Sequence, residues 1–317
     1  MLGLVEIQWW HWVSFIALVL LFLAADLGFF HREAREVTIK EALVWTLFFV
    51  TCALAFAAML VPLRGKHEAL EFLTGYVIEL SLSMDNVFVI ALIFDYFRIP
   101  RRFQHRVLFW GILGALLMRG LMIWLGTQLV ASYEWVFFIF GAFLLITGIR
   151  MFFGAEEEVK PEENLILRAV RKIFPVTTRF HGEHFVAIEQ GRKMLTPLAL
   201  ALVMVETTDL VFAMDSIPAI FAVTTKDFIV FTSNVFAILG LRSLYFLLAG
   251  AVAYFSYLKY GLAVVLVYVG IKMLLQEWYK IPTHWSLAVV ILVIGGSILL
   301  SILTGKKGKA AEGDTPQ

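Results

Sequence analysis

The sequence has few of the residues that soluble proteins place on their surfaces or use in disulfides. Charged residues make up only 16% of the 317 positions and hydrophobic residues 61%, whereas an ordinary soluble domain has about 25% charged residues. The formal net charge is +1, which says little about partners, and we expect no nucleic-acid partner. The single cysteine, Cys52, excludes an internal disulfide. These scarcities argue against a soluble globular protein and predict an all-α, polytopic membrane protein in contact with the lipid bilayer.

Nine stretches of the chain are long and apolar enough to cross a bilayer as helices, which takes about 20 residues each. The N-terminal "MLGLVEIQWWHW" lacks the basic region and the small-residue cleavage site of a signal peptide, so we expect the first stretch to be a retained helix. The nine candidate spans are 10–30, 42–62, 72–95, 107–127, 133–153, 195–221, 228–250, 256–277 and 284–303.

The chain contains an internal repeat, because spans three to five resemble spans six to eight. Asp85 in "ELSLSMDN" matches Asp215 in "DLVFAMDS", and Arg119 matches Arg242. Three spans per copy is an odd number, so the two copies must be inverted, and inverted repeats place substrate sites near the bilayer midplane. The expected organisation is two N-terminal helices (1–71), repeat one (72–153), a cytoplasmic loop (154–194), repeat two (195–277), a last span (278–303) and a disordered cytoplasmic tail (304–317).

Lysine and arginine are unevenly divided between the loops on the two sides, with 19 on one side and four on the other. The positive-inside rule then predicts that the N-terminus lies outside and the C-terminus in the cytoplasm. Within the long cytoplasmic loop, "NLILRAVRKIF" predicts a helix lying on the membrane surface, and "HFVAIEQGRKMLTP" predicts a short hairpin.

Five acidic side chains lie inside the apolar spans, where an unpaired charge is costly. Asn86 and Ser216 follow two of them and add neutral oxygen atoms. Carboxylate, amide and hydroxyl oxygens without histidine or cysteine suit a hard divalent cation such as Mg²⁺, Ca²⁺ or Mn²⁺. Pro218 predicts a break in its helix, which would help Asp209 and Asp215 to converge, whereas the first repeat has no proline at the matching place. The predicted metal ligands are Glu79, Asp85, Asn86, Glu206, Asp209, Asp215 and Ser216.

The same acids could instead serve only to lock the helix bundle by pairing with Arg119 and Arg242. Two arginines are too few for five acids, since about three negative charges would remain. A divalent cation together with a proton would nearly cancel that excess, so we expect a metal site with the two arginines as counter-charges. We expect no enzyme activity, because the sequence has no phosphate loop and no nucleophile–base pair.

Three motifs carry a resemblance that covers residues 10–303 of the chain. "FLTGYVIELSLSMDNVFV", "VMVETTDLVFAMDSIPAIFAVT" and "SNVFAILGLRSLYFLLAG" resemble the TerC family and, within it, the Alx-like bacterial members. The resemblance implies a bacterial inner-membrane protein of the LysE-type transporter group, linked to manganese export and historically to tellurite resistance. It also implies that the family's acidic cluster falls on the five acids named above. An acidic site disfavours direct transport of the tellurite oxyanion.

Two functions of different classes follow from this resemblance. The first is a divalent-cation transporter, foremost an Mn²⁺ exporter, that works by alternating access with protons exchanging on the carboxylates. The residues alone leave Mg²⁺, Ca²⁺ and Fe²⁺ open, because these ions share the same ligand types. The second is a membrane scaffold or assembly factor that holds a structural ion and recruits a partner through the 154–194 loop. The oligomeric state is left open.

Overall fold

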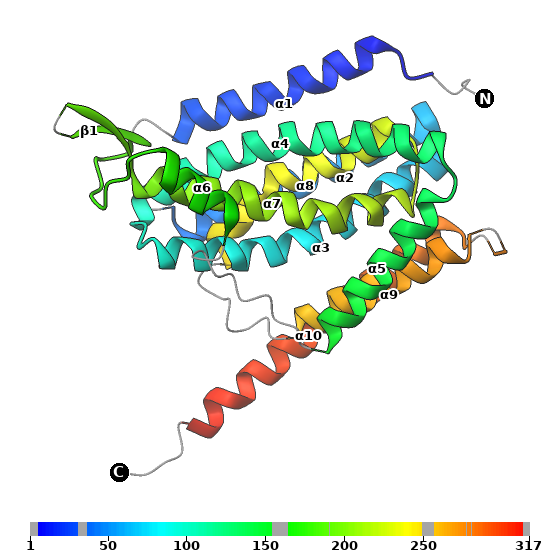
Figure 1. Cartoon of the computed structure of the whole chain (residues 1–317). Helices are drawn as coiled ribbons and strands as arrows, with labels where there is room; N and C mark the ends of the chain where they lie inside the picture. The colour runs from blue at the N-terminus through cyan, green and yellow to red at the C-terminus, as the bar shows by residue number, and fades with distance from the viewer. Residues whose placement is uncertain are drawn as a thin grey trace.

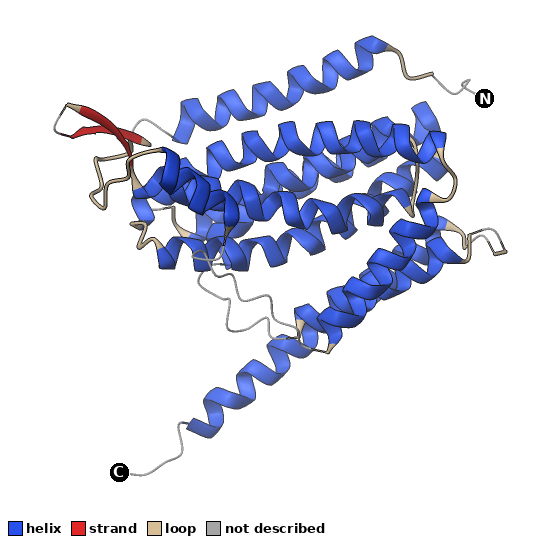
Figure 2. Ribbon diagram, in the orientation of Figure 1, coloured by secondary structure: helices blue, strands red, loops and turns tan. Residues whose placement is uncertain are grey.

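The computed structural model describes residues 6–30, 37–153, 164–189, 191–248, 257–276, 278–279 and 281–312. This part of the chain contains ten helices and one two-stranded sheet, so the prediction of an all-α fold is confirmed (Figures 1 and 2). The helices are α1 (Trp9–Phe30), α2 (Ile39–Arg64), α3 (Lys66–Tyr96), α4 (Arg101–Ser132), α5 (Val136–Phe152), α6 (Leu165–Ile173), α7 (Pro197–Phe221), α8 (Asp227–Leu248), α9 (Leu258–Leu274) and α10 (Thr283–Glu312). The strands are β1 (Val186–Glu189) and β2 (Arg192–Leu195).

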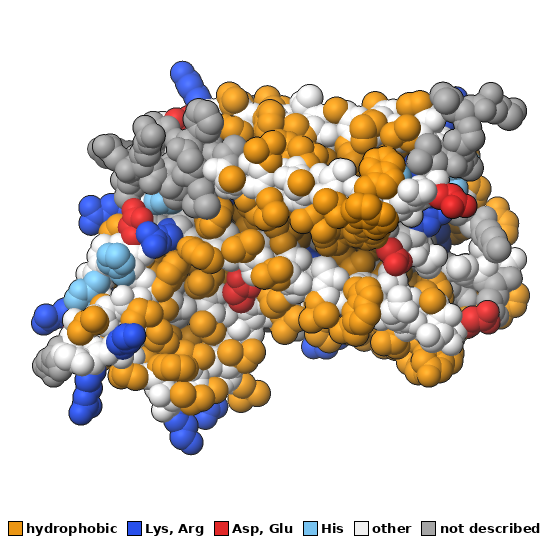
Figure 3. Space-filling model, turned by 90° about the horizontal axis from the view of Figure 1, so that it is seen from above, with side chains coloured by type: hydrophobic (Ala, Val, Ile, Leu, Met, Phe, Trp, Pro, Cys, Tyr) orange, Lys and Arg blue, Asp and Glu red, His pale blue; other side chains and the backbone are white. Residues whose placement is uncertain are grey.

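Each of the nine predicted spans corresponds to one of these helices. In the described residues, six helices are long and apolar enough to cross a membrane, namely α2, α3, α4, α7, α8 and α10, while the apolar stretches of α1 and α5 are shorter. Hydrophobic side chains cover most of the face seen in Figure 3, and Lys and Arg gather at the end of the molecule that carries the hairpin. The chain is therefore a multi-pass integral membrane protein.

Local interactions determine where α2 begins and where it ends before α3. Thr38 caps α2, accepting a hydrogen bond from the backbone N–H of Glu41 at 3.3 Å, while the Glu41 carboxylate accepts one from the N–H of Thr38 at 3.1 Å. Gly65 alone separates α2 from α3 and has a φ of 91°, which favours glycine. This one-residue turn brings α2 back against α3.

The packing of the helices follows the predicted repeat. Helix α3 packs against α8 as α4 packs against α7, and α5 packs against α9. Equivalent helices run in opposite directions, as Figure 1 shows for α3 with α7 and for α5 with α9. Reciprocal packing between antiparallel equivalents is what two inverted three-helix repeats produce.

A glycine seam between α5 and α9 shows the same two-fold relationship at atomic detail. A methyl group added at Gly148 would lie 2.8 Å from the carbonyl oxygen of Ala263 and 2.9 Å from the nitrogen of Val267. One added at Gly270 would lie 2.8 Å from the carbonyl oxygen of Gly141 and 2.7 Å from the nitrogen of residue 145. The contacted residues Ala263 and Val267 lie seven and three residues before Gly270, and the contacted residues 141 and 145 lie seven and three residues before Gly148. The two backbones thus touch through equivalent residues.

The 154–194 loop forms the predicted helix and hairpin in its described residues, 164–189 and 191–194. Asn164 caps α6 by accepting a hydrogen bond from the N–H of Leu167 at 2.9 Å. Strands β1 and β2 pair in antiparallel register around Gly191, whose φ is 76°. Ile188 of β1 is 72% exposed, so the hairpin presents an apolar side chain to its surroundings.

The hairpin is held to the preceding loop by Glu189. Its Oε1 accepts a hydrogen bond from the Thr177 hydroxyl at 2.8 Å and lies 2.5 Å from Nε2 of His181. The hydrogen bond with His181, followed by that from Thr177, lowers the pKa of the Glu189 carboxyl. A lowered folded-state pKa gives a stabilisation that is present above the unfolded-state pKa and is lost as the pH falls through the folded value.

We therefore expect acidification to loosen the hairpin. Amide hydrogen exchange in β1 and β2 should be slow at neutral pH and should speed up once Glu189 is protonated. Glu189→Gln should exchange faster at neutral pH and lose this pH dependence, and the exposed neighbour Lys193→Gln is the matched control. Equal pH dependence in wild type and Glu189→Gln would contradict this role for the carboxylate.

Two expectations about helix ends are wrong. Helix α7 is not broken at Pro218 but continues to Phe221, because the proline lies in the last turn, where only one backbone hydrogen bond is lost. Helix α10 extends to Glu312, so residues 304–312 are helical rather than disordered. That stretch contains three Lys, two Ala and one Glu, which are good helix formers. Residues 313–317 of the predicted tail lie outside the described residues.

Candidate functional site

The centre of the bundle contains a buried cluster of three charged side chains from three helices. Glu79 of α3, Arg119 of α4 and Asp209 of α7 are 0%, 2% and 6% exposed. Nη2 and Nε of Arg119 donate to Oδ1 and Oδ2 of Asp209 at 2.8 and 3.2 Å, and Nη1 donates to Oε1 of Glu79. The bidentate geometry with Asp209 makes this a strong pairing. One arginine thus joins the two repeats through an acid from each.

Neutral oxygen and nitrogen atoms surround the cluster. Asn86 donates through Nδ2 to Oδ1 of Asp209 at 3.4 Å. Nη1 of Arg119 also lies 3.4 Å from the Ser216 hydroxyl oxygen and 3.5 Å from Oδ1 of Asn234. The predicted neutral ligands Asn86 and Ser216 are therefore both at the cluster. Asn234 is a further member that brings α8 into contact with it.

Two buried acceptor atoms at the cluster stay without a hydrogen bond. Within the described residues, Oε2 of Glu79 and Oδ1 of Asn86 have no hydrogen-bond partner. Native proteins pair nearly all such atoms, and exceptions often mark a position for an ion, a water molecule or a proton. Both atoms are oxygens, which are the donor atoms that hard cations take.

The other three predicted acids are less buried than this cluster. Asp85, Glu206 and Asp215 are each partly exposed. The Glu206 carboxylate lies against Gly114 of α4, where any larger residue would collide with it. In the part of the chain that the structure describes, no three His, Cys, Asp or Glu side chains are close enough together to hold a metal ion. The five-acid site is thus not assembled in this conformation, and the Arg119 guanidinium bridges two of its acids.

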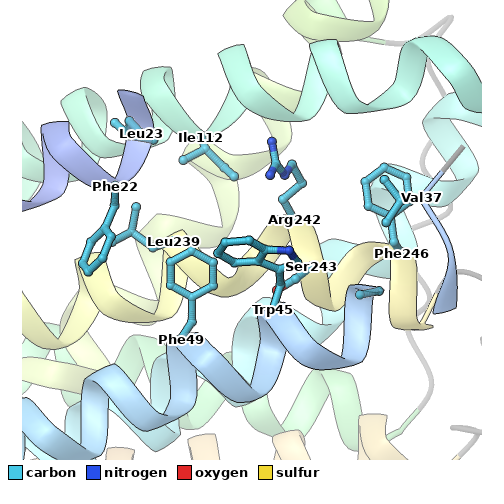
Figure 4. Close-up of a pocket in the computed structure, with 11 residues that line it drawn as sticks. Phe22, Leu23, Val37, Trp45, Phe49, Ile112, Leu239, Arg242, Ser243 and Phe246 are labelled. Carbon is cyan, nitrogen blue, oxygen red and sulfur yellow. The ribbon is translucent and has the colours of Figure 1, made fainter. Parts of the chain in front are cut away.

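Arg242, which the sequence matched to Arg119, occupies a different place. It lines an apolar cavity between α1, α2, α4 and α8, where its side chain points from α8 toward the side of Ile112 (Figure 4). A second cavity lies beside Asp209 and Asn86. Ile112 of α4 lines both cavities.

The sequence was then compared with known proteins. It matches the family described as "Integral membrane protein TerC family" over residues 64–309. The chain belongs to the TerC family. A protein from Myxococcus xanthus described as an uncharacterised membrane protein is 50% identical over 306 residues, or 96% of each chain. "Putative membrane-bound redox modulator Alx" of Escherichia coli K12 is 48% identical over 288 residues, covering 88% of this chain and 90% of that protein. No solved structure matches the chain.

The TerC-family match includes both repeats and all five acids, whereas α1 and nearly all of α2 lie before it. This TerC-family protein also has an ionic cluster that the sequence reasoning missed, at the end of the molecule opposite the hairpin. Lys226, after α7, lies 3.2 Å from Glu68 and 3.0 Å from Glu71 of α3, and Arg64 lies 2.6 Å from Glu68. Arg64 ends α2 and Glu68 lies in the first turn of α3, so this ion pair bridges the turn at Gly65. This cluster ties the start of α3 to the loop before α8.

Proposed function

We propose that this protein carries a divalent cation across the bacterial inner membrane, with Mn²⁺ as the foremost candidate. The observation that supports it most is the buried Glu79–Arg119–Asp209 cluster, in which an acid from each inverted repeat meets at the centre of the bundle. Transporters with inverted repeats place their substrate sites there. Localisation with the N-terminus outside and the C-terminus in the cytoplasm is part of the same proposal.

The chemistry of the cluster favours a hard cation. Its uncharged members are amide and hydroxyl side chains, and no histidine or cysteine takes part in the contacts of Arg119, Glu79 and Asp209 described above. Mn²⁺, Mg²⁺ and Ca²⁺ take oxygen ligands, while softer ions prefer thiolate and imidazole. Manganese is preferred here on the family resemblance, because the ligand types alone do not separate these ions from one another or from Fe²⁺.

Arg119 holds the carboxylates in the conformation without bound cation. Two ionised carboxylates without a partner would be costly in an apolar bundle. The guanidinium of Arg119 cancels one of these two negative charges when no cation is bound. A cation that enters must displace this arginine from at least one acid, and protons taken up or released by the other carboxylates would couple the exchange to the proton gradient. Catalysis of a chemical reaction has no role in this proposal.

A scaffold or assembly factor is the second candidate, and the exposed hairpin favours it. Ile188 is 72% exposed on β1, and Leu165 and Ile173 of α6 are 76% and 71% exposed. Such surfaces recruit partners or lie against lipid. If a redox role of the kind in the E. coli relative's name applies here, it does not use an internal disulfide, because Cys52 is the only cysteine.

Total cellular manganese under manganese load separates the two candidates. The host is an exporter-deficient bacterium expressing wild type, Asp85→Asn, Asp215→Asn or Ile188→Asp, with membrane levels of each variant matched. A transporter lowers manganese in wild type and Ile188→Asp and fails to do so in the two Asn variants. For a scaffold we expect Ile188→Asp to lose the effect on cellular manganese and the two Asn variants to keep it. Unchanged manganese with wild type would refute manganese export.

A further inference from the structure

Helices α3 and α8 pack together and contact each other through polar groups at two levels. At the end of the bundle opposite the hairpin, Nζ of Lys226, just before α8, lies 3.0 Å from Oε2 of Glu71 on α3. At the centre, Arg119 donates to Glu79 of α3 and lies 3.5 Å from Oδ1 of Asn234 on α8. Glu79 lies eight residues after Glu71, and Asn234 lies eight residues after Lys226. The two helices therefore run in the same direction and in register, with about 12 Å between the two levels.

A hydroxyl group lies between these two levels. Glu71, Gly75 and Glu79 are spaced four residues apart, so they share one face of α3. A methyl group added at Gly75 would lie 2.8 Å from Oγ of Ser233, which approaches it from α8 and is 0% exposed. Carboxylate, hydroxyl and carboxylate oxygens thus follow one another along the α3–α8 interface. Hard cations take ligands of these types.

The central end of this interface has hydrogen-bonding capacity that is not used. Among the residues that the structure describes, Oε2 of Glu79 and Nδ2 of Asn234 are buried without a hydrogen-bond partner. Both residues are 0% exposed. Native proteins rarely leave such atoms unpaired, and the exceptions often mark a position for water or an ion. The Ser233 hydroxyl opposite Gly75 is then the next oxygen in the direction of Glu71.

We propose that the α3–α8 interface is the path of the cation between Glu79 and the end of the bundle opposite the hairpin, and that Lys226 closes this path. The inference rests on the proposed transport function and adds the route to its site. Lys226 also lies 3.2 Å from Glu68, so its ammonium group holds two acids at the mouth of the path. Glu68 and Glu71 are only 7% and 5% exposed. A cation that passes has to replace Lys226 at these carboxylates, because a buried acid needs a positive partner.

The surroundings of Lys226 allow it to leave. Its side chain is 39% exposed and lies outside the helices, whereas the two acids have further basic neighbours on α2 and α3. Arg64 lies 2.6 Å from Glu68, and Nε2 of His67 lies 3.2 Å from Glu71. Release of Lys226 therefore leaves each acid beside another basic side chain and removes the ionic link between α3 and α8.

The test labels a cysteine placed halfway along the path with a water-soluble maleimide, in purified protein without added metal. Cys52→Ala provides the background and Ser233→Cys is the reporter. Val235→Cys is the matched control, because Val235 is 2% exposed and lies on the opposite face of α8. We expect Lys226→Gln to raise the labelling rate at 233 about tenfold, a modest shift of a two-state equilibrium, and to leave the rate at 235 unchanged. Lys226→Arg keeps the charge and should keep 233 as protected as in wild type.

A second measurement connects the path to the cation. Once the maleimide is attached to Ser233→Cys in the Lys226→Gln background, manganese flux into liposomes should fall to that of empty liposomes, because the label fills the path. Unlabelled protein of the same variant should keep its flux. Flux that persists with the label attached would place the route of the cation elsewhere and overturn the inference.

The inference is also overturned if Lys226→Gln leaves labelling at 233 unchanged, or if labelling at 235 rises by the same factor, since the whole bundle is then loosened. Should Lys226→Gln fail to fold, Glu71→Gln takes its place. It removes the 3.0 Å ion pair from the α3 side and should raise labelling at 233 in the same way. Labelling needs no cation. Access to 233 that depends on Lys226, without manganese flux in unlabelled protein, would refute the proposed function, and manganese flux without such access would refute only this inference.

Discussion

We expect Asp209→Asn to reduce manganese export, the activity proposed above, to the background of cells that lack the protein, while the protein remains folded. The substitution keeps the size of the side chain and removes one of the two charges that Arg119 bridges. Arg119 then pairs one-to-one with Glu79, so the buried charges stay balanced and the fold is retained. The site loses a carboxylate that a divalent cation needs, and we expect at least about a tenfold loss of efflux, because each lost 1.4 kcal/mol of interaction is worth that factor.

The matched control is Asp227→Asn, which changes an exposed aspartate in the first turn of α8. It should leave export and thermal stability unchanged within error. Both variants are compared at equal membrane levels, and their elution as a single species in detergent checks folding. Export by Asp209→Asn at the wild-type rate would show that the buried pair has only a structural role.

Alanine at Gly148 or Gly270 will strongly destabilise the protein. In both cases the added methyl group would lie within 3 Å of backbone atoms of the facing helix, at 2.8 Å from Ala263 for Gly148 and at 2.7 Å from residue 145 for Gly270. Backbone atoms cannot move aside as a side-chain end can, so α5 and α9 must separate. Overpacking of this kind typically costs about 1–3 kcal/mol.

Gly295→Ala in α10 is the control, because nothing lies within 4 Å of a methyl group added there. It should be neutral or stabilising by up to about 1 kcal/mol, the helix preference of alanine over glycine. Thermal unfolding of the purified proteins measures all three variants. The double variant Gly148→Ala/Gly270→Ala should lose less unfolding free energy than the sum of the two single variants, since one separation of the helices relieves both contacts. Equal melting temperatures for Gly270→Ala and Gly295→Ala would contradict the close backbone contact between α5 and α9 at Gly270.

Sequence patterns were sufficient for the helices and for some of the partners at the centre of the bundle. Hydrophobic length identified the spans, and the repeated acid motifs together with Arg119 identified residues that meet in the structure. The cost of unpaired charge in an apolar bundle is what made this possible, because an intramembrane acid must find a partner.

Other features depend on packing that a linear pattern does not contain. The sequence matched Arg119 to Arg242, but it did not indicate that Arg119 joins two acids while Arg242 lines an apolar cavity. Pro218 has the chemistry of a helix breaker, yet its position in the last turn makes its effect small. The backbone contact at Gly270 depends on how closely two helices approach, which small residues permit but do not specify.

The most direct test of the central claim is manganese flux into liposomes that contain only the purified protein. A trapped metal-sensitive dye reports Mn²⁺ entry after a manganese gradient is applied, with wild type, Asp209→Asn and Asp227→Asn reconstituted at equal density. Our account predicts flux with wild type and Asp227→Asn, and none above empty liposomes with Asp209→Asn. Flux no faster than in empty liposomes for wild type, with and without a proton gradient, would contradict it.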